Sequence, residues 1–437
     1  MSRTYPANNL WSARRAAEDP LAFLQALAAE GGDVIPFRLG RRIAFLLNHP
    51  RHVEDVLVRN SANFLKGPGY QRAARLLGNG LLTASGPLHT ERRRLTQTAF
   101  DHRRMPGYGA IMVAHAATLR DRWHAGTPID AAEQMRELSL GIAGEALLGV
   151  DLACKADTVR RAVASALPTM DGLLAVVAGP RHTSAGAREL RAIVDEVVEL
   201  RRRSQDTRDD LLALLLGAHD PDDEASTRQL QDEAVTFLVA GHDTVAHALT
   251  WTWTLLADHP QVDARLEQEL SAVLGGRLPV AEDLSRLAFT RAVLAEAMRL
   301  FPPAWIIVRR ASAPHRCGDV EILAGAIVVA SPFLMHRDPR FFQEPSVFDP
   351  ARWLNTEAGD RIAIERPKLS YFPFGAGPRS CVGEGFAWME GTLVLATIAQ
   401  AWRLPRADGA KTIPVPKITL RPQGPVLLRP ERRSHGG

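Results

Sequence analysis

A glycine-rich loop that contains a cysteine carries the strongest chemical signal in this sequence. Residues 372–390 read FPFGAGPRSCVGEGFAWME, so Cys381 follows a turn with Gly375, Gly377 and Pro378 and directly precedes a predicted helix. The positive end of that helix and its free backbone N–H groups favour the thiolate form of such a cysteine. The glycines let the backbone pass close to a flat, bulky group. The plain alternative is a small buried cysteine at a loop-to-helix junction.

An acid–alcohol pair interrupts the most apolar part of the chain. Residues 240–244 read AGHDT and place Asp243 and Thr244 in a hydrophobic helical segment. A buried carboxylate is costly unless it is partnered or hydrated. Threonine and glycine also let helical hydrogen bonds open locally and admit a water molecule. The pentapeptide alone leaves two interpretations open, a proton-relay pair or a back-bonded threonine beside an exposed aspartate.

Taken together, these segments resemble the cytochrome P450 superfamily. The cysteine loop matches Phe-x-x-Gly-x-Arg-x-Cys-x-Gly at Phe374, Gly377, Arg379, Cys381 and Gly383, and it continues with Phe386, Ala387 and Glu390. The resemblance covers roughly residues 20–430, with the motifs in the expected order. It implies the cytochrome P450 fold, which is mainly α with small β-sheets.

The resemblance implies roles for residues of the cysteine loop. Cys381 would be the axial iron ligand of a haem b and the only protein ligand of the metal, and thiolate ligation favours O–O cleavage. Arg379 would pair with a haem propionate, and Phe374 would pack against the thiolate side of the ring. Gly375 and Gly383 would belong to the same cofactor-binding loop.

The long helix would supply the catalytic residues. By the resemblance, Asp243 and Thr244 deliver protons during oxygen activation. Ala240 and Gly241 leave room for O₂ over the iron. Val245 is a modest departure, because many relatives have a second hydroxyl there.

Further cations complete the predicted haem site. His89 and Arg93 lie four residues apart on one predicted helical face. Arg309 follows the Pro302-Pro303 turn, where the family has a propionate-binding arginine. With Arg379, these residues offer three guanidinium groups and an imidazole to two carboxylates. Arg310 replaces Arg309 if the register is shifted by one residue.

A third segment that resembles the family has a structural role. Glu296 and Arg299 lie three residues apart on a helix, a spacing that is usually a surface ion pair. In the family this pair is buried and joined by an arginine from a later loop, here Arg352. Ala351 stands where the family usually has glutamate. The resemblance predicts that Glu296→Ala yields haem-free, aggregated protein.

Helices dominate the elements that must position these residues. A capping box at Ser226 and Gln229 predicts a helix of roughly 33 residues, about 50 Å long, that ends before Pro260 and runs through the interior. A further helix is predicted over 384–402. Short β-branched segments after residue 304 are typical of strands. We expect one domain over 1–437, with a helix-rich lobe at about 89–300 and 373–402. The β-rich lobe would combine the N-terminal segment with about 304–330 and 403–430.

Composition excludes several classes of protein. The 437 residues are 46% hydrophobic and 23% charged, with a net charge of +4 that does not indicate nucleic-acid binding. The arginine runs 92–94 and 201–203 are interpreted as mostly solvated helix faces. Three widely spaced cysteines favour a reducing compartment. No segment is typical of a signal peptide or a membrane anchor, so a cytoplasmic, monomeric protein is expected.

The resemblance predicts a monooxygenase that inserts one oxygen atom from O₂ into a hydrophobic small molecule. Electrons would come from NAD(P)H through a separate ferredoxin reductase and ferredoxin. A terpenoid of secondary metabolism is the favoured substrate, and a fatty acid or a macrolide is the alternative. A peroxide-driven peroxygenase and a non-catalytic haem sensor are the rival functions. The predicted pocket residues are 65–82, 166–181, Phe237 and Ala240, 304–307 and the turn near Gln423.

Overall fold

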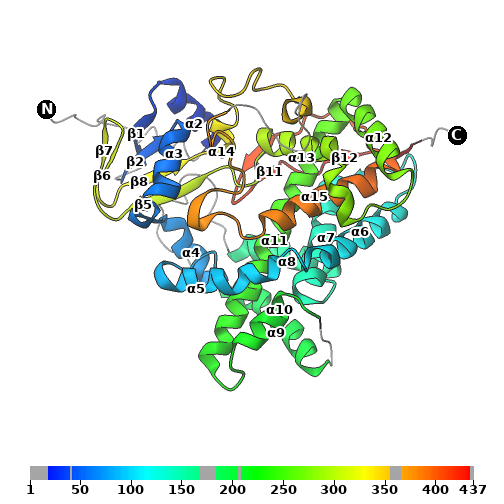
Figure 1. Ribbon diagram of the computed structural model, residues 1–437, viewed down its shortest axis with the longest axis horizontal. Helices are drawn as coiled ribbons and strands as arrows, with labels where there is room; N and C mark the ends of the chain where they lie inside the picture. The colour runs from blue at the N-terminus through cyan, green and yellow to red at the C-terminus, as the bar shows by residue number, and fades with distance from the viewer. Residues whose placement is uncertain (1–17, 40–41, 167–183, 205–207, 355–365, 434–437) are drawn as a thin grey trace.

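The computed structural model describes residues 18–39, 42–166, 184–204, 208–354 and 366–433. Helices form most of this part of the chain, and a sheet lies at one end (Figure 1). The helices are α2 (Pro20–Ala29), α3 (Pro50–Glu54), α4 (Pro68–Leu77), α5 (Gly86–Gln97), α6 (Met105–Arg122), α7 (Ala131–Ala143), α8 (Ala156–Ala166), α9 (Ser184–Arg203), α10 (Leu211–Ala218), α11 (Glu224–Asp258), α12 (Pro260–Leu274), α13 (Ala288–Leu300), α14 (Pro332–Met335) and α15 (Glu384–Ala399). A mainly α fold with small sheets is confirmed.

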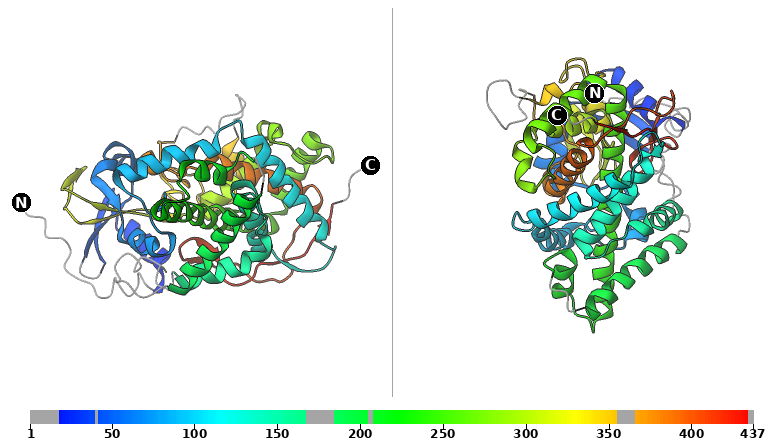
Figure 2. Two further views of the ribbon diagram at one scale, coloured as in Figure 1. Left: turned by 90° about the horizontal axis from the view of Figure 1, so that it is seen from below. Right: turned by 90° about the vertical axis from the view of Figure 1, so that its right-hand side faces the viewer.

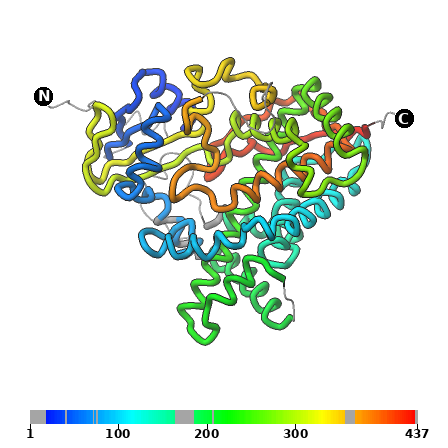
Figure 3. The backbone as a smooth tube through the Cα atoms, viewed as in Figure 1, coloured from blue at the N-terminus to red at the C-terminus, as the bar shows by residue number. Residues whose placement is uncertain are grey.

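The largest sheet joins distant parts of the sequence. Its order is β1 (Val34–Leu39), β2 (Arg42–Leu47), β8 (Ile327–Ala330), β5 (Ile307–Ala311) and β3 (Phe64–Lys66). Strands β2 and β8 are parallel, and the other neighbours are antiparallel. Figure 3 shows the blue N-terminal strands beside the yellow segment that contains β8. The sheet therefore presents β3 and β5, at one edge, to the helical part.

The remaining strands form two-stranded pairs. They are β4 (Ile129–Asp130) with β12 (Leu427–Leu428), β6 (His315–Cys317) with β7 (Val320–Ile322), β9 (Trp402–Arg403) with β13 (Glu431–Arg432), and β10 (Pro414–Pro416) with β11 (Leu420–Pro422). The helix predicted to reach Trp402 ends at Ala399, because Trp402 pairs with Arg432 in the β9–β13 ladder.

Helix α11 runs through the middle of the molecule, with other helices on both sides (Figure 2). It is 35 residues long, and its C-terminal half is buried almost without interruption. The predicted start at Ser226 is wrong by three residues. Asp223 is the N-cap, and its carboxylate accepts hydrogen bonds from the backbone N–H groups of Ala225 and Ser226. Ser226 instead accepts a hydrogen bond from the backbone of Asp220, which holds the preceding turn.

Two arginines in the predicted solvated runs are buried, so that interpretation is wrong for them. Arg92 forms an ion pair of 2.7 Å with Glu233, and both side chains are at most 5% exposed. Arg201 forms one of 2.5 Å with Asp210, again with both side chains 5% exposed. The partner of Arg92 is 141 residues away and that of Arg201 is nine residues away, so spacing within each run cannot reveal either.

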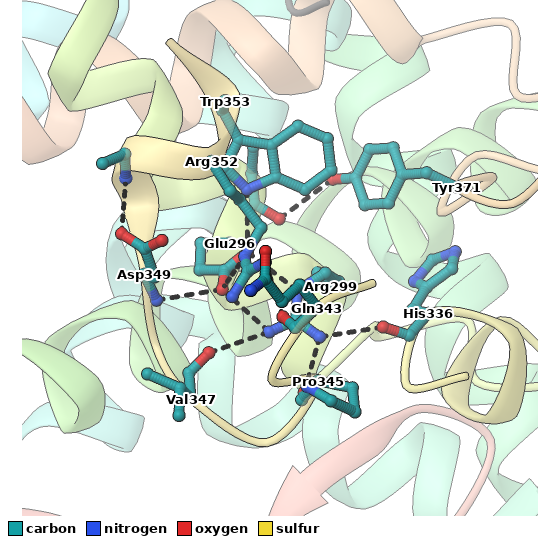
Figure 4. Close-up of polar contacts among 12 residues, drawn as sticks. Glu296, Arg299, His336, Gln343, Pro345, Val347, Asp349, Arg352, Trp353 and Tyr371 are labelled. Carbon is teal, nitrogen blue, oxygen red and sulfur yellow. Dashed lines mark hydrogen bonds and ion pairs between the residues drawn. The ribbon is translucent and has the colours of Figure 1, made fainter. Parts of the chain in front are cut away.

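A charged network at Glu296 fastens the loop after α14 to the core (Figure 4). The Glu296 carboxylate accepts hydrogen bonds from Arg299, Arg352 and the Trp353 indole, all at 2.8–2.9 Å. Arg299 and Glu296 have no exposed surface. Arg299 also donates to the carbonyls of His336, Pro345 and Val347, which satisfy its remaining N–H groups.

Removal of this carboxylate should destabilise the protein severely. We expect Glu296→Ala to cost about 3–5 kcal/mol, because two guanidinium groups stay buried without their counter-charge. Soluble yield and the denaturant midpoint of unfolding measure the effect. Asp157→Ala is the control, since its ion pairs with Arg160 and Arg161 are exposed and add little to stability. A soluble Glu296→Ala protein with the wild-type midpoint would contradict the prediction.

Candidate functional site

A cavity of about 350 Å³ lies between α11 and the loop that precedes α15. Its lining is largely apolar, with Phe237, Val245 and Ala248 on the α11 side. Ile306 and Ile307 enter from the segment that leads into β5. Among the described lining residues none is Asp or Glu. The cavity therefore suits an apolar group, and any charge that it accepts should be negative.

The cysteine loop is folded tightly against the rest of the chain. Cys381 donates its backbone N–H to the carbonyl of Phe374 at 2.9 Å, and a single 3-10 turn, η9 (Gly377–Arg379), lies between them. Gly377 has a φ of +71°, and a Cβ there would overlap the carbonyl oxygen of Leu57. Glycine is therefore required by both conformation and space. Phe374 packs on Trp388 with ring centroids 5.6 Å apart.

Cys381 is among the residues that line the cavity. Burial raises the pKa of its thiol to about 11, although the Gly383 N–H acts in the opposite direction. Sequence reasoning expected the helix start to favour the thiolate. The direction of that effect is present, but burial outweighs it. A stable thiolate here requires a cation in direct contact, such as a metal ion.

A cluster of basic side chains occupies one end of the cavity. Lys66, His89, Arg93, Arg309 and Arg379 all line it. Burial, and then the positive charges of its neighbours, lower the pKa of Lys66 to about 7 and that of His89 to about 4. Burial and the neighbouring Arg309 also lower the pKa of Arg379. This mutual repulsion is relieved by an anion, so the cluster fits a ligand with two carboxylates.

Two of the predicted cations are held in place by backbone groups around them. Arg93, on α5, donates to the carbonyl and the hydroxyl of Ser380 at 2.6 and 3.3 Å. Arg379 donates to the carbonyl of Phe64 at 3.2 Å. Lys66 lies in the predicted pocket segment 65–82 but was not among the predicted haem-binding residues. Its register opposite Arg309 in the β3–β5 ladder places it there, and only the tertiary pairing reveals this neighbour.

The choice between Arg309 and Arg310 follows from the alternation of the strand. Ile307 and Arg309 line the cavity, whereas Val308 packs in the core behind the sheet. Arg310 is half-buried and does not line the cavity. Successive side chains of a strand point to opposite faces. The structure therefore places Arg309, rather than Arg310, beside Arg379.

The acid–alcohol segment is regular α-helix. Ala240, Gly241 and Thr244 line the cavity, and the helix continues through them without a break. Thr244 donates its hydroxyl to the carbonyl of Ala240 at 3.1 Å. A Cβ on Gly241 would meet Ala143 and Leu147 at 3.5 and 3.7 Å, which is ordinary contact. The predicted local opening is not seen, and the threonine is back-bonded within its helix.

Asp243 points away from the cavity and is not among its lining residues. Its carboxylate accepts a hydrogen bond of 2.8 Å from the hydroxyl of Thr419, and the Nε2 atom of His247 lies 3.9 Å away. Burial acts to raise the pKa of Asp243. His247, His242, the Thr419 hydroxyl and Arg421 outweigh it and hold the pKa below its ordinary value. The side chain is 33% exposed, so an ionised carboxylate here reaches solvent.

Some of the predicted pocket residues line the cavity. Lys66, Tyr70, Leu81 and Leu82 line the cavity, as do Phe237, Ala240, Ala304, Ile306 and Ile307. Gln423 does not line it, and Trp305 turns away to bond the carbonyl of Lys417. The prediction for 166–181 lies outside the described residues, except at Ala166.

Comparison with known proteins gives matches over nearly the whole chain. Residues 5–429 match the model of the family Cytochrome P450. The chain is 38% identical to Cyclooctatin synthase of Streptomyces melanosporofaciens, across 95% of this chain and 92% of that protein. It is 36% identical to Cyclooctat-9-en-7-ol 5-monooxygenase of the same organism, across 92% and 87%. It is 33% identical to Pentalenene oxygenase of Streptomyces avermitilis, across 95% and 94%.

The residues of the cavity fit the haem that this family carries. The thiol of Cys381 faces an apolar space that has cations and no carboxylate at one end. A flat macrocycle with a central metal and two carboxylates matches each of these features. Within the described residues, none of the helices combines the length and the hydropathy that a membrane span requires.

Replacement of Arg309 should weaken haem retention. Arg309→Ala removes a buried cation from the carboxylate-binding end, and charge-assisted hydrogen bonds contribute roughly 1.5–3 kcal/mol. We expect haem to dissociate about 10–100-fold faster in a transfer assay to an excess of a haem-binding acceptor protein. Arg310→Ala is the matched control, because the neighbouring arginine points elsewhere. Equal dissociation rates for the two variants would contradict the assignment.

Proposed function

Because this chain belongs to the cytochrome P450 family, we propose that it inserts one oxygen atom from O₂ into a terpenoid, by hydroxylation or epoxidation. That the chain is a P450 monooxygenase follows from the family and from its relatives. The proposal concerns the substrate and the roles of single residues. The observation that carries it is the apolar, carboxylate-free lining of the cavity beside Cys381.

The relatives support a hydrocarbon-like substrate. Pentalenene and cyclooctat-9-en-7-ol are, by their names, an alkene and an alkenol. Such molecules offer many apolar contacts and few hydrogen-bonding groups. The cavity suits such molecules, because it has few polar side chains away from the basic cluster. On α11, the hydroxyl groups that line it are those of Thr236 and Thr244.

We assign the site residues to four tasks. Cys381 holds the iron as a thiolate, and haem b, when bound, supplies the chemistry that activates O₂. His89, Arg93, Arg309 and Arg379 hold its carboxylates at one end of the cavity, with Phe374, Gly375 and Gly383 in the loop beneath. The apolar lining orients the substrate and excludes bulk water.

The fourth task is proton delivery by Asp243 and Thr244. Asp243 is in contact with solvent and can be protonated there. To pass the proton inward, its carboxylate must leave the hydroxyl of Thr419, and Thr244 must leave the carbonyl of Ala240. Both changes are rotations of single side chains. Ala240 and Gly241, which line the cavity on the same helix, leave space for O₂.

We further propose the partners. Electrons come from NAD(P)H through a ferredoxin reductase and a ferredoxin, since the family relies on redox partners. The protein acts as a cytoplasmic monomer on a hydrophobic small molecule, without binding nucleic acid or membrane. The net charge of +4 is small for 437 residues, in keeping with this assignment.

Optical titration of the purified ferric protein tests the substrate class. A terpenoid that enters the cavity should shift the Soret band of the haem-loaded protein to shorter wavelength, because it would displace water from the haem. Fatty acids and macrolides are titrated in parallel, and a shift with one of these alone would assign the substrate to that class. Turnover is then compared with O₂ plus reductase and with peroxide alone, and faster turnover with peroxide would contradict the O₂-dependent assignment.

Loss of the Asp243 carboxylate should uncouple electron use from product formation. We expect Asp243→Asn to lower kcat on the order of 10²-fold, within the usual contribution of general acid catalysis. The measurement is product formed per NAD(P)H consumed. Asp258→Asn is the control, because it makes the same change at the far end of α11, in a partly exposed pair with Arg406. An unchanged ratio for Asp243→Asn would remove that residue from the relay.

A further inference from the structure

The turn between α4 and α5 forms one wall of the cavity. Leu81 and Leu82 reach the cavity from this turn, which spans residues 78–85. It contains no regular helix or strand, so neighbouring side chains must satisfy its backbone groups. Three charged side chains from outside the turn do so, and they hold its two edges.

Carboxylates of α11 hold the N–H groups of the turn. Asp232 accepts from the backbone of Asn79 at 2.7 Å, and Glu233 accepts from that of Leu81 at 2.9 Å. Glu233 is fixed in turn by Arg92 at 2.7 Å, in a pair that is almost fully buried. The turn also packs closely on α11, because a Cβ on Gly78 would overlap the Asp232 carboxylate. This edge is therefore attached to the central helix.

The ammonium group of Lys66 holds the carbonyl groups of the turn. Its Nζ atom donates to the carbonyls of Leu81, Leu82 and Ala84 at 3.0, 2.6 and 2.6 Å. An ammonium has three donors, so all of them are used. Lys66 lines the same cavity as Arg309 and Arg379, but it has no donor left for a carboxylate of the haem. Its charge is directed at the turn.

We infer that Lys66 is a positioning residue that sets substrate selectivity, by fixing the wall that carries Leu81 and Leu82 over the cavity. The turn is held as a bridge between the carboxylates of α11 and the ammonium on β3. Without the ammonium, three carbonyls lose their donor and that side of the wall is free to move. A substrate in the cavity then has more than one orientation available. The inference rests on the proposed function insofar as the substrate is an apolar molecule oriented by this wall.

Lys66→Met tests the inference, because methionine keeps the length and the apolar stem of the side chain. Hydrogen exchange of the Thr83 and Ala84 amides, which donate to the carbonyl of Gly80 beside the carbonyls that Lys66 holds, is measured in the haem-bound, substrate-free protein. We expect it to be about tenfold faster or more, given the usual strength of charged hydrogen bonds. Lys155→Met is the control, because Lys155 lies in a partly exposed ion pair with Glu196. Exchange at wild-type rates in Lys66→Met overturns the inference, whatever the substrate proves to be.

A selectivity measurement separates positioning from general stability. The ratio of oxidised products is measured for a compound that shifts the Soret band, whether terpenoid or not. Lys66→Met and Leu82→Ala should each change this ratio, and the double variant should add little to either, because both act through the same wall. Additive changes in the product ratio would overturn the inference. Loss of haem from Lys66→Met with wild-type amide exchange would also overturn it and would assign Lys66 to haem binding. A failed terpenoid titration with faster exchange would refute only the substrate proposal.

Discussion

The burial of α11 is the constraint on which the rest of the structure depends. This helix of 35 residues contacts α7, α9, α13 and α15, and it carries one wall of the cavity. Its interior position leaves its polar side chains few choices of partner. Glu233 pairs with Arg92, and Asp243 accepts a hydrogen bond from Thr419, which directly precedes β11. The site is thus arranged around fixed charges on one rigid element.

Charge is distributed unevenly around this helix. Carboxylates lie on α11 outside the cavity, whereas the cavity itself has cations alone among its described charged residues. Such a cluster of like charges is unfavourable by itself, which is visible in the pKa of Lys66 near 7 and that of His89 near 4. A dianionic prosthetic group removes this cost on binding. The same residues therefore affect both the affinity for the cofactor and the stability of the protein.

Local sequence patterns predicted the parts of the site that lie within one segment. The spacing around Cys381, the AGHDT segment and the Glu296–Arg299 pair needed no knowledge of distant contacts. The contacts missed are those that the tertiary fold creates. Lys66 meets a turn through backbone carbonyls, which have no sequence signature. Asp243 and Thr419 are far apart in sequence, and their hydrogen bond depends on how the C-terminal strands return. Arg92 looked solvated because its partner lies on another helix.

The parallel pairing of β2 with β8 has a consequence for folding during synthesis on the ribosome. Ala44 is paired with Ile327, so the inner edge of β2 has no strand partner until the chain has been synthesised well past its middle. At typical rates of translation this interval is on the order of tens of seconds. During it the N-terminal hairpin presents a bare, apolar strand edge, Ala44 to Leu47, to its surroundings. Heavier demand on chaperones during overproduction follows from this order of synthesis.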